Sequence, residues 1–219
     1  IPQVDYLGVR AARWHTQPQR TLDEISELGL PVFVKPAHLG SSVGITKVSE
    51  AEQRQSALEA AFAHDELVIV EAMARSIEIE CAVLGLTAEE RGQQTDALLA
   101  SEPGQISFQG EFYDFEAKYM PGGMELRVPA PISPAAHRRV RELASQVFTY
   151  TGCDGLARVD FFLDGESVLV NELNTMPGFT PTSVYAKLIG ASGIAYPQLL
   201  DRLCRLALEC HSRRQAYRH

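Results

Sequence analysis

The stretch Leu156–Phe179, with the sequence LARVDFFLDGESVLVNELNTMPGF, decides the fold of this chain. It contains two apolar runs separated by Asp164-Gly165, and each run carries two polar side chains at alternate positions. These side chains are Arg158 and Asp160 in the first run, and Glu172 and Asn174 in the second. Short apolar runs of this kind, separated by a turn dipeptide, are typical of two adjacent β-strands. The pattern therefore predicts a β-hairpin.

The polarity of the hairpin constrains the loop that joins its strands. Side chains alternate between the two faces of a strand, so each polar pair shares one face. Both pairs point to the same side only if the loop holds an odd number of residues. A three-residue loop, in which Gly165 supplies the necessary positive φ, sets Arg158 opposite Glu172. The same loop sets Asp160 opposite Val170, and we expect this odd loop rather than a two-residue turn.

Asp160, Glu172 and Asn174 would then form a site made only of oxygen ligands. Mg²⁺ prefers one or two carboxylates together with phosphate oxygens and water, so this ligand set suits it. An ordinary buried salt bridge in a hairpin is the alternative, because structural ion pairs are common. The hairpin alone does not decide between these two interpretations.

Composition narrows the class of protein. The chain has 219 residues, a formal charge of −8 and 45% hydrophobic residues, which suits one large or two small globular domains. The negative charge argues against a non-specific nucleic-acid or anionic-membrane surface. No apolar run approaches the ~20 residues that span a bilayer, and no secretory signal opens the chain. Four scattered cysteines without a CxxC pair indicate a reduced, cytoplasmic protein without a zinc site.

A second group of polar residues lies near the start of the chain. The buried strand predicted at Pro31–Lys35 ends in a lysine and leads into a Gly/Ser loop, Ala37–Gly44, with the sequence AHLGSSVG. Backbone N–H groups of such a loop are able to face an anion. The loop is not a Walker motif, because no Gly-Lys-Ser/Thr opens a helix. An ordinary turn between two strands is the alternative.

The remaining pattern predicts strands at 45–48, 67–70 (ending in Glu71), 77–84 and 97–101. In the 77–84 strand, Glu78 and Glu80 share one face. Helices are predicted over 21–28, 49–64, 133–151, 183–188 and 196–210, with Thr21, Ser49 and Ser133 at their starts. A change in composition near Arg75-Ser76 suggests a domain boundary.

The segment 102–131 is rich in Gly and Pro, and we expect it to be a long, strand-poor loop. It contains the aromatic and charged run FYDFEAKY at 112–119. Loops of this length are usually functional, which favours a lid or binding loop. A disordered insertion is the alternative, and the four aromatic residues argue against it.

Taken together, the lysines, the arginine, the Gly/Ser loop and the carboxylates indicate a nucleoside triphosphate site with Mg²⁺. Phosphoryl transfer depends mainly on positioning and charge neutralisation, which these groups supply. The His-Arg-Asp and Asp-Phe-Gly signatures of protein kinases are absent from the sequence.

Four motifs in order carry a family resemblance: PVFVKPAHLGSSVG at 31–44, FYDFEAKY at 112–119, GLARVDFF at 155–162 and NELNTMPGF at 171–179. From about Pro31 to Cys210 the chain resembles the D-alanine–D-alanine ligases of the ATP-grasp superfamily. The resemblance implies an α/β (α+β) fold in which two subdomains with largely antiparallel sheets sandwich the nucleotide. Residues 1–76 would form the nucleotide-binding central subdomain. Residues 77–219 would form the C-terminal subdomain with the metal, catalytic and acceptor sites and the lid.

The resemblance also implies roles for individual residues in ATP binding. Lys35 would contact the ATP phosphates, and Glu78 would hold the ribose hydroxyls. The adenine hinge would begin at Glu71 and read the base through the backbone of Ala72 and Met73. Ser41 and Ser42 would lie in the loop that covers the phosphates, and Lys118 and Tyr119 would belong to a mobile lid. Asp160, Glu172 and Asn174 would hold two Mg²⁺ ions, with Mn²⁺ as an alternative.

Further implied roles concern catalysis. Arg158 and the Gly178 N–H would stabilise the transferring phosphoryl group and the later oxyanion. Ser41 would orient substrate, and Ser183 would bind the carboxylate of the second substrate. The implied reaction phosphorylates the carboxylate of one D-alanine, and the amine of a second D-alanine then displaces phosphate. Tyr119 favours an amine acceptor, because relatives that use D-lactate tend to carry histidine in this part of the lid.

The implied product is D-alanyl-D-alanine for peptidoglycan precursors. The partners implied are ATP and D-alanine, without nucleic acid or membrane, and a homodimer is common in the family. Family members also have an N-terminal domain that supplies a glutamate for the first D-alanine and a lysine for ATP. A chain that began at Ile1 would bind nucleotide and ligate poorly or not at all. The alternatives are a related ligase that joins other amino acids in a secondary-metabolite pathway and an ATP-binding fragment without ligase activity.

Overall fold

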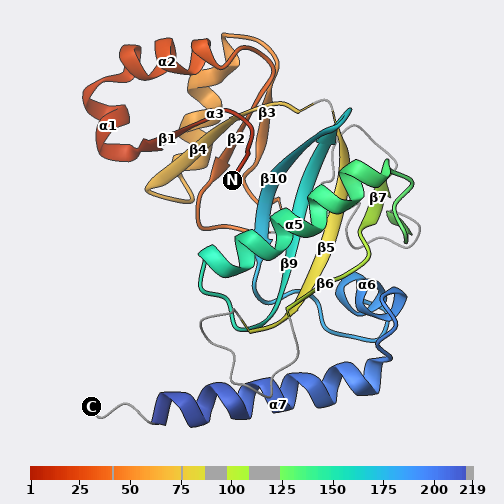
Figure 1. The fold of residues 1–219 in the computed structure, drawn as a ribbon. Coiled ribbons are helices and arrows are strands. Elements are labelled where there is room, and N and C mark those ends of the chain that lie inside the picture. The colour runs from red at the N-terminus through yellow and green to blue at the C-terminus, as the bar shows by residue number, and fades with distance from the viewer. Residues whose placement is uncertain (41, 75, 87–97, 109–123, 216–219) are drawn as a thin grey trace. The chain divides into compact units, whose positions relative to one another are not determined.

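The computed structural model describes residues 1–40, 42–74, 76–86, 98–108 and 124–215 (Figure 1). The chain divides into two compact units, and the change of unit falls between Arg75 and Ser76. One unit holds Gln3–Arg75 with Phe108 and Met124, and the other holds Ile1–Pro2 with the described residues of Ser76–Ser107 and Glu125–His219. Both units are built on antiparallel sheets with helices, which confirms the α+β class. The separate roles expected for 1–76 and 77–219 remain predictions.

The first unit contains a four-stranded antiparallel sheet in the order β1-β4-β2-β3. Its strands are β1 (Tyr6–Arg10), β2 (Val32–Pro36), β3 (Thr46–Val48) and β4 (Leu67–Ala72). Its helices are α1 (Ala11–Thr16), α2 (Pro18–Glu27) and α3 (Gln53–Phe62). The strands predicted at 31–35, 45–48 and 67–70 are confirmed, with ends that shift by one or two residues.

Alternation along these strands separates a core face from a polar face. Val32 and Val34 of β2 and Val68 and Val70 of β4 are at most 1% exposed, and they pack with apolar side chains of the helices. Burial of each such side chain stabilises the fold by about 1.5–3 kcal/mol. The intervening side chains project from the opposite face of the sheet. That face carries Phe33, Lys35, Ile69 and Glu71.

Two helices of this unit begin elsewhere than predicted. Helix α2 begins at Pro18, whose fixed φ suits the first turn, and not at Thr21. Thr21 is buried, and its hydroxyl donates to a carbonyl one turn earlier at 2.9 Å, so it does not cap the helix. Helix α3 begins at Gln53 and not at Ser49. The Gln53 side chain accepts the Ser49 backbone N–H at 3.1 Å, so Ser49 lies before the helix.

The second unit contains a six-stranded sheet in the order β10-β9-β5-β7-β8, with β6 also paired to β5. Its strands are β5 (Ile77–Gly85), β6 (Leu99–Ala100), β7 (Gly104–Phe108), β8 (Met124–Arg127), β9 (Gly155–Asp164) and β10 (Ser167–Asn174). Its helices are α5 (Pro134–Tyr150), α6 (Val184–Ala191) and α7 (Tyr196–Gln215). Strands β7 and β8 correct the prediction that 102–131 is strand-poor, because both pair within the sheet. The lid expected at 112–119 lies outside the described residues.

Helices cover both faces of this sheet. Helix α5 crosses one face (Figure 1), where Leu143 and Phe148 pack on Val159 and Phe161. Its predicted cap is confirmed, since Ser133 accepts the Ala136 N–H at 3.1 Å. Helices α6 and α7 cover part of the other face, with Tyr185, Leu188, Ile189 and Leu199 against Ala82 and Leu84. Among the described residues, no helix is both long enough and apolar enough to cross a bilayer. The four cysteines are free thiols.

The hairpin forms as predicted, but its connecting loop does not. The β9–β10 turn holds two residues, Gly165 and Glu166, because Asp164 pairs with Ser167. Gly165 alone of these two has a positive φ, of 58°, as a type II′ turn requires. The expected three-residue loop is therefore wrong.

A β-bulge supplies the odd residue instead. The register shifts between Val170 and Glu172, which leaves Asn171 unpaired. Asp160 consequently lies opposite Glu172, and Arg158 opposite Asn174, so the expected pairings of these two residues are also wrong. Because the shift exchanges the two faces of β10, Val170 remains in the core while Glu172 joins the polar face.

Candidate functional site

Three carboxylates form a row across neighbouring strands of the second unit. Glu80 of β5 pairs with Asp160 of β9, which in turn pairs with Glu172 of β10. Paired residues in a sheet project to the same face, and this face is opposite the α5 core. Glu78 lies two residues before Glu80 on the same face, opposite Phe162. The structure therefore brings Asp160 and Glu172 together as the sequence predicted.

Arg158 lies among these carboxylates and neutralises part of their charge. Its Nε and Nη2 donate to the two oxygens of Asp160 at 2.7 and 2.6 Å, a bidentate pair. Its Nε also lies 3.2 Å from Glu80 Oε2. The side chain of Arg158 is 18% exposed, that of Asp160 12% and that of Glu80 7%. A buried cluster of this kind loses far more stability when one partner is removed than it gains as a whole.

The electrostatics of the cluster follow from this burial. Desolvation raises the pKa of Glu80 well above its usual range, and the Asp160 charge raises it further. Desolvation opposes the charge of Arg158, but hydrogen bonding to Asp160 and the surrounding carboxylates raise its pKa. Glu80 Oε2 accepts no hydrogen bond among the described residues. This oxygen has the ion pair with Arg158 but no hydrogen bond in the described part of the chain, so a further donor or cation is favourable beside it.

Asn174, Gly178 and Ser183 follow the row along the chain. The Asn174 Oδ1 accepts the Met176 N–H at 3.0 Å, which fixes the amide at the end of β10. Gly178 lies beside Ser183, because a Cβ built on Gly178 would lie 3.4 Å from the Ser183 hydroxyl oxygen. That oxygen accepts the Thr180 N–H at 3.0 Å before α6 begins. Gly178 and Ser183, both expected to contact substrate, are therefore neighbours.

In the first unit, the polar face of the β1–β4 sheet carries the predicted phosphate lysine. Lys35 of β2 and Glu71 of β4 form an ion pair with Nζ and Oε2 at 2.6 Å, and both side chains are mostly buried. Phe33 lies beside them, paired with Glu71 on one side and with Lys47 of β3 on the other. The Glu71 carboxylate thus positions the Lys35 ammonium on this face.

The expected adenine hinge continues from Glu71 through Ala72 and Met73. The Ala72 N–H donates to Asp5 O at 2.9 Å, and the Met73 N–H donates to Pro31 O at 3.1 Å. Both N–H groups are therefore engaged within the unit. A base recognised here would use backbone carbonyls or replace the Met73 bond to Pro31.

The Gly/Ser loop joins β2 to β3. Ser42 has a φ of 60°, and Gly44 has a φ of 74°, so the loop passes twice through the left-handed region. A Cβ on Gly44 would lie 2.9 Å from Pro36 Cγ, which only glycine avoids. The other residues expected in ATP binding and catalysis at this loop and the lid, Ser41, Lys118 and Tyr119, lie outside the described residues.

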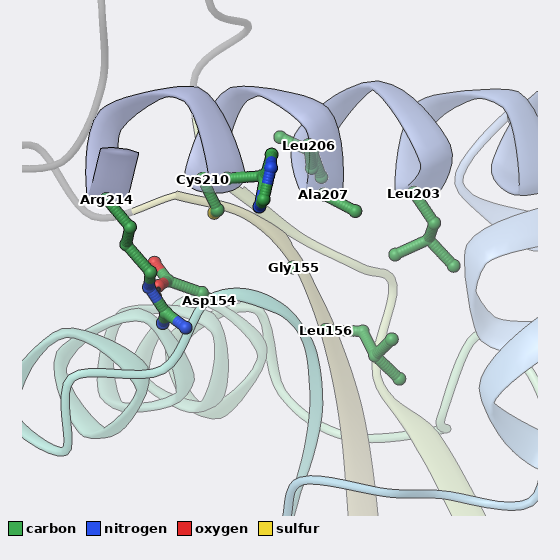
Figure 2. Close-up of a pocket in the computed structure, with 9 residues that line it drawn as sticks. Asp154, Gly155, Leu156, Leu203, Leu206, Ala207, Cys210 and Arg214 are labelled. Carbon is green, nitrogen blue, oxygen red and sulfur yellow. Dashed lines mark ion pairs between the residues drawn. The ribbon is translucent and has the colours of Figure 1, made fainter. Parts of the chain in front are cut away.

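A separate pocket of about 400 Å³ lies between the start of β9 and α7 (Figure 2). Leu156, Leu203 and Leu206 line its apolar part, and Arg214 pairs with Asp154 at 3.5 Å at its edge. Its lining contains none of the predicted site residues. We assign it to the packing of α7, on which Leu199 and Leu206 are buried and Leu203 and Cys210 are partly buried.

The hairpin residues fit the chemistry of a Mg²⁺ site. No cluster of three or more histidine, cysteine, aspartate or glutamate side chains within the described ranges has the geometry to hold a metal. The predicted set instead has two carboxylates and an amide, which leaves room for phosphate oxygens and water. Asp160, Glu172 and Asn174 all carry oxygen donors on one face of β9 and β10. Both oxygens of Asp160 accept from Arg158, so occupation by a metal would compete with that pair.

Sequence reasoning missed one residue of this cluster. Glu80 was expected to share a face with Glu78, yet only Glu78 received a role. In the structure Glu80 is the more buried of the two and the one that contacts Arg158. Its alternation with apolar Ile79 and Cys81 was the available signal. The pairing of β5 with β9, which brings Glu80 to Asp160, is not visible from alternation alone.

Comparison with known proteins identifies the family. The family model described as "D-ala D-ala ligase C-terminus" matches residues 1–205. A D-alanine--D-alanine ligase from Deinococcus radiodurans is 45% identical over 213 residues, which cover 95% of this chain and 60% of the relative. A solved VanG D-Ala:D-Ser ligase from Enterococcus faecalis has a TM-score of 0.80 and 34% identity, with 94% of this chain and 57% of that chain covered.

A solved D-alanine-D-alanine ligase from Coxiella burnetii has a TM-score of 0.79 and 34% identity over 99% of this chain and 55% of that chain. The chain thus spans little more than half the length of the relatives that it matches. The family model covers nearly all of the described residues, including the hairpin, the Gly/Ser loop and α6. The chain belongs to the D-ala D-ala ligase C-terminus family.

Proposed function

We propose that the protein to which this chain belongs joins two D-alanine molecules in an ATP-dependent reaction that supplies peptidoglycan precursors. The observation that carries the proposal is the β9–β10 register, which sets Asp160 opposite Glu172, while Arg158 donates to Asp160 and lies 3.2 Å from Glu80. Oxygen ligands beside a buried guanidinium are the groups that phosphoryl transfer requires. The matching family model and relatives support the same reaction class.

The first step transfers the γ-phosphoryl group of ATP to a D-alanine carboxylate and releases ADP. Lys35, held by Glu71 at 2.6 Å, would contact the phosphates, and Glu78 would hold the ribose. Arg158 would neutralise charge on the transferring group, and Glu80, 3.2 Å from its Nε, would keep the guanidinium in the cluster when a metal competes for Asp160. Asp160, Glu172 and Asn174 would hold Mg²⁺, or Mn²⁺ as an alternative. The metal would supply charge neutralisation for the phosphate oxygens.

In the second step, the amine of the second D-alanine attacks the acyl phosphate, and the C–O bond to phosphate breaks. Arg158 and the Gly178 N–H would stabilise the oxyanion of the tetrahedral intermediate. Ser183 would bind the carboxylate of the second D-alanine. Its closeness to Gly178 supports this pairing, since one acceptor molecule would meet both groups. Exclusion of water by the lid, including Lys118 and Tyr119, would protect the acyl phosphate.

Two alternatives remain distinct from this proposal. One is a ligase with another acceptor, and the D-Ala:D-Ser ligase at 34% identity makes D-serine the first to test. The other is an ATP-binding fragment without ligase activity. Both alternatives retain Mg-ATP binding, so binding alone does not separate them from the proposal.

ADP release separates the three. The protein is assayed with ATP and Mg²⁺ alone, and then with D-alanine, D-alanine plus D-serine, or D-alanine plus D-lactate. The proposal expects D-alanine-dependent ADP release and D-alanyl-D-alanine as the main product. A mixed dipeptide as the main product would favour the other-acceptor ligase. ATP binding without D-alanine-dependent ADP release would contradict ligase activity.

A further inference from the structure

The carboxylate of Asp65, just before β4, accepts several hydrogen bonds within the first unit. Its side chain is 6% exposed. It accepts the backbone N–H of His38 at 2.7 Å, the His38 ring nitrogen Nδ1 at 2.9 Å, and the Leu67 backbone N–H at 3.0 Å. Because an ionised carboxylate only accepts, Nδ1 carries the proton in this contact. These bonds, that of the Leu67 N–H first, lower the pKa of Asp65 to about 2.

Asp65 connects the start of the Gly/Ser loop to β4. Strand β2 ends at Pro36, and the next N–H, of Ala37, donates to Leu67 O at 2.9 Å. The following N–H, of His38, is the one that Asp65 accepts. The first two residues of the loop are thus tied to the segment that begins β4.

The other end of the loop rests on the same segment. A Cβ on Gly44 would lie 3.1 Å from His64 Cδ2, the residue before Asp65. Within the loop, the Val43 N–H donates to Gly40 O at 3.2 Å. The loop is therefore short, tied at its start to Asp65 and Leu67 by hydrogen bonds, and close to His64 at Gly44. A loop of glycine and serine would otherwise adopt many conformations, each of which costs entropy to restrict.

We propose that Asp65 is a positioning residue for phosphate binding, which sets the conformation of the Gly/Ser loop through His38 and does not itself touch the nucleotide. The inference rests on the proposed function, in which this loop receives the ATP phosphates. A preorganised loop pays less ordering cost when its ligand binds. Loss of the Asp65 contacts is therefore expected to lower the affinity for each ligand in proportion to its phosphate contacts. The affinity for the nucleoside, which has no phosphate, is expected to change little.

The test compares ATP, ADP and adenosine on wild-type protein and on two variants. Asp65→Ala removes all three hydrogen bonds, and we expect the Kd for ATP to rise about tenfold, the effect of one lost hydrogen bond. The Kd for adenosine, measured as a competitor, is expected to change less than about twofold. His38→Ala removes only the ring contact of a side chain that is 73% exposed, so this variant tests the inference even if Asp65→Ala fails to fold. For His38→Ala we expect a smaller rise in the Kd for ATP than in Asp65→Ala, and again a larger effect on ATP than on adenosine.

Glu66→Gln is the matched control. Glu66 is the adjacent carboxylate, 81% exposed and 3.9 Å from Arg10, and its loss is expected to leave all three affinities unchanged. Equal weakening of ATP and adenosine in Asp65→Ala and His38→Ala would indicate a merely structural role and overturn the inference. Unchanged ATP affinity in both variants would also overturn it, while D-alanine-dependent ADP release by the wild type would leave the proposed function standing. A wild-type protein that binds no ATP would overturn both.

Discussion

Asp160 lies directly opposite Glu172 across β9 and β10, although the turn between these strands holds two residues. An even turn alone would have placed the two carboxylates on opposite faces of the sheet. Val168 and Val170 lie in the core, and the bulge at Asn171 then exchanges the faces of the strand, so that Glu172 lies on the same face as Asp160. The hairpin therefore contributes side chains to the apolar core along most of β10, and to the polar cluster after the bulge.

Deletion of Asn171 is expected to be tolerated. Without it, the two strands pair regularly, with Val170 still opposite Phe161 and Glu172 still opposite Asp160. Urea unfolding is expected to give a free energy of unfolding within about 1 kcal/mol of wild type, which is the scale of typical single changes.

Deletion of Leu169 is the matched control for the bulge. To keep Glu172 opposite Asp160, the strand would have to move Val170 out of the core and bring Asn171 in. The lost burial of Val170 costs about 1.5–3 kcal/mol, and an unsatisfied amide costs about 1–3 kcal/mol more. Equal losses of stability in the two deletions would contradict the assigned register.

Arg158→Ala is expected to destabilise the protein by about 3–5 kcal/mol, because it leaves Glu80 and Asp160 buried without their cation. Glu80→Gln in the same background removes one of the unpaired charges and is expected to recover part of this loss. Denaturant unfolding measures the stability, and ADP release measures the activity. Neither Arg158→Ala nor the double variant should retain activity. A double variant no more stable than Arg158→Ala would contradict the charge balance assigned to Glu80.

Gly44→Ala and Gly165→Ala test where glycine is required. Both positions have a positive φ, of 74° and 58°. A Cβ at Gly44 would meet Pro36 and His64, whereas a Cβ at Gly165 meets nothing within 4 Å. We expect Gly165→Ala to cost about 1–2 kcal/mol from backbone conformation alone and Gly44→Ala to cost more. Only Gly44→Ala should weaken ATP binding, and the reverse order in either measurement would contradict the loop geometry.

The pH dependence of stability is expected to include Asp65. Its pKa falls from an ordinary value of 3.8 to about 2 in the folded protein. Its contribution is therefore fully present above about pH 4 and is lost as the pH falls toward about 2. Asp65→Asn is expected to flatten the loss of stability between these pH values, measured by urea unfolding. An unchanged slope in Asp65→Asn would indicate that other carboxylates dominate acid unfolding.

Local patterns predicted most of the elements that hold the site. Alternation identified β2, β4, β5 and both strands of the hairpin, because each buries one apolar face. The need for an odd residue in the hairpin was also inferred correctly. Its place was wrong, because Asp164-Gly165 is a strong turn signal, whereas nothing in the run VLVNELN distinguishes a bulge from a regular strand.

Other features depended on contacts between distant segments. Strands β7 and β8 were missed because they are short segments of a Gly- and Pro-rich stretch and form strands by pairing in the sheet. Gly104 has no room for a side chain, since a Cβ there would lie 2.7 Å from Leu188. The Asp65–His38 contact joins two loops 27 residues apart, and neither residue has a periodic pattern that would predict it.

The metal and phosphoryl-transfer role of the hairpin is tested most directly by the Mg²⁺-dependent release of ADP, in the presence of D-alanine, by wild type, Asp160→Asn and Glu172→Gln. Asp164→Asn, an exposed carboxylate in the same hairpin, is the control. We expect normal release in the control and a loss of more than about a hundredfold in each of the other two variants, with weaker Mg²⁺ dependence. Full D-alanine-dependent ADP release by Asp160→Asn and Glu172→Gln, at the wild-type Mg²⁺ concentration, would contradict the assignment of the hairpin as the metal and phosphoryl-transfer site.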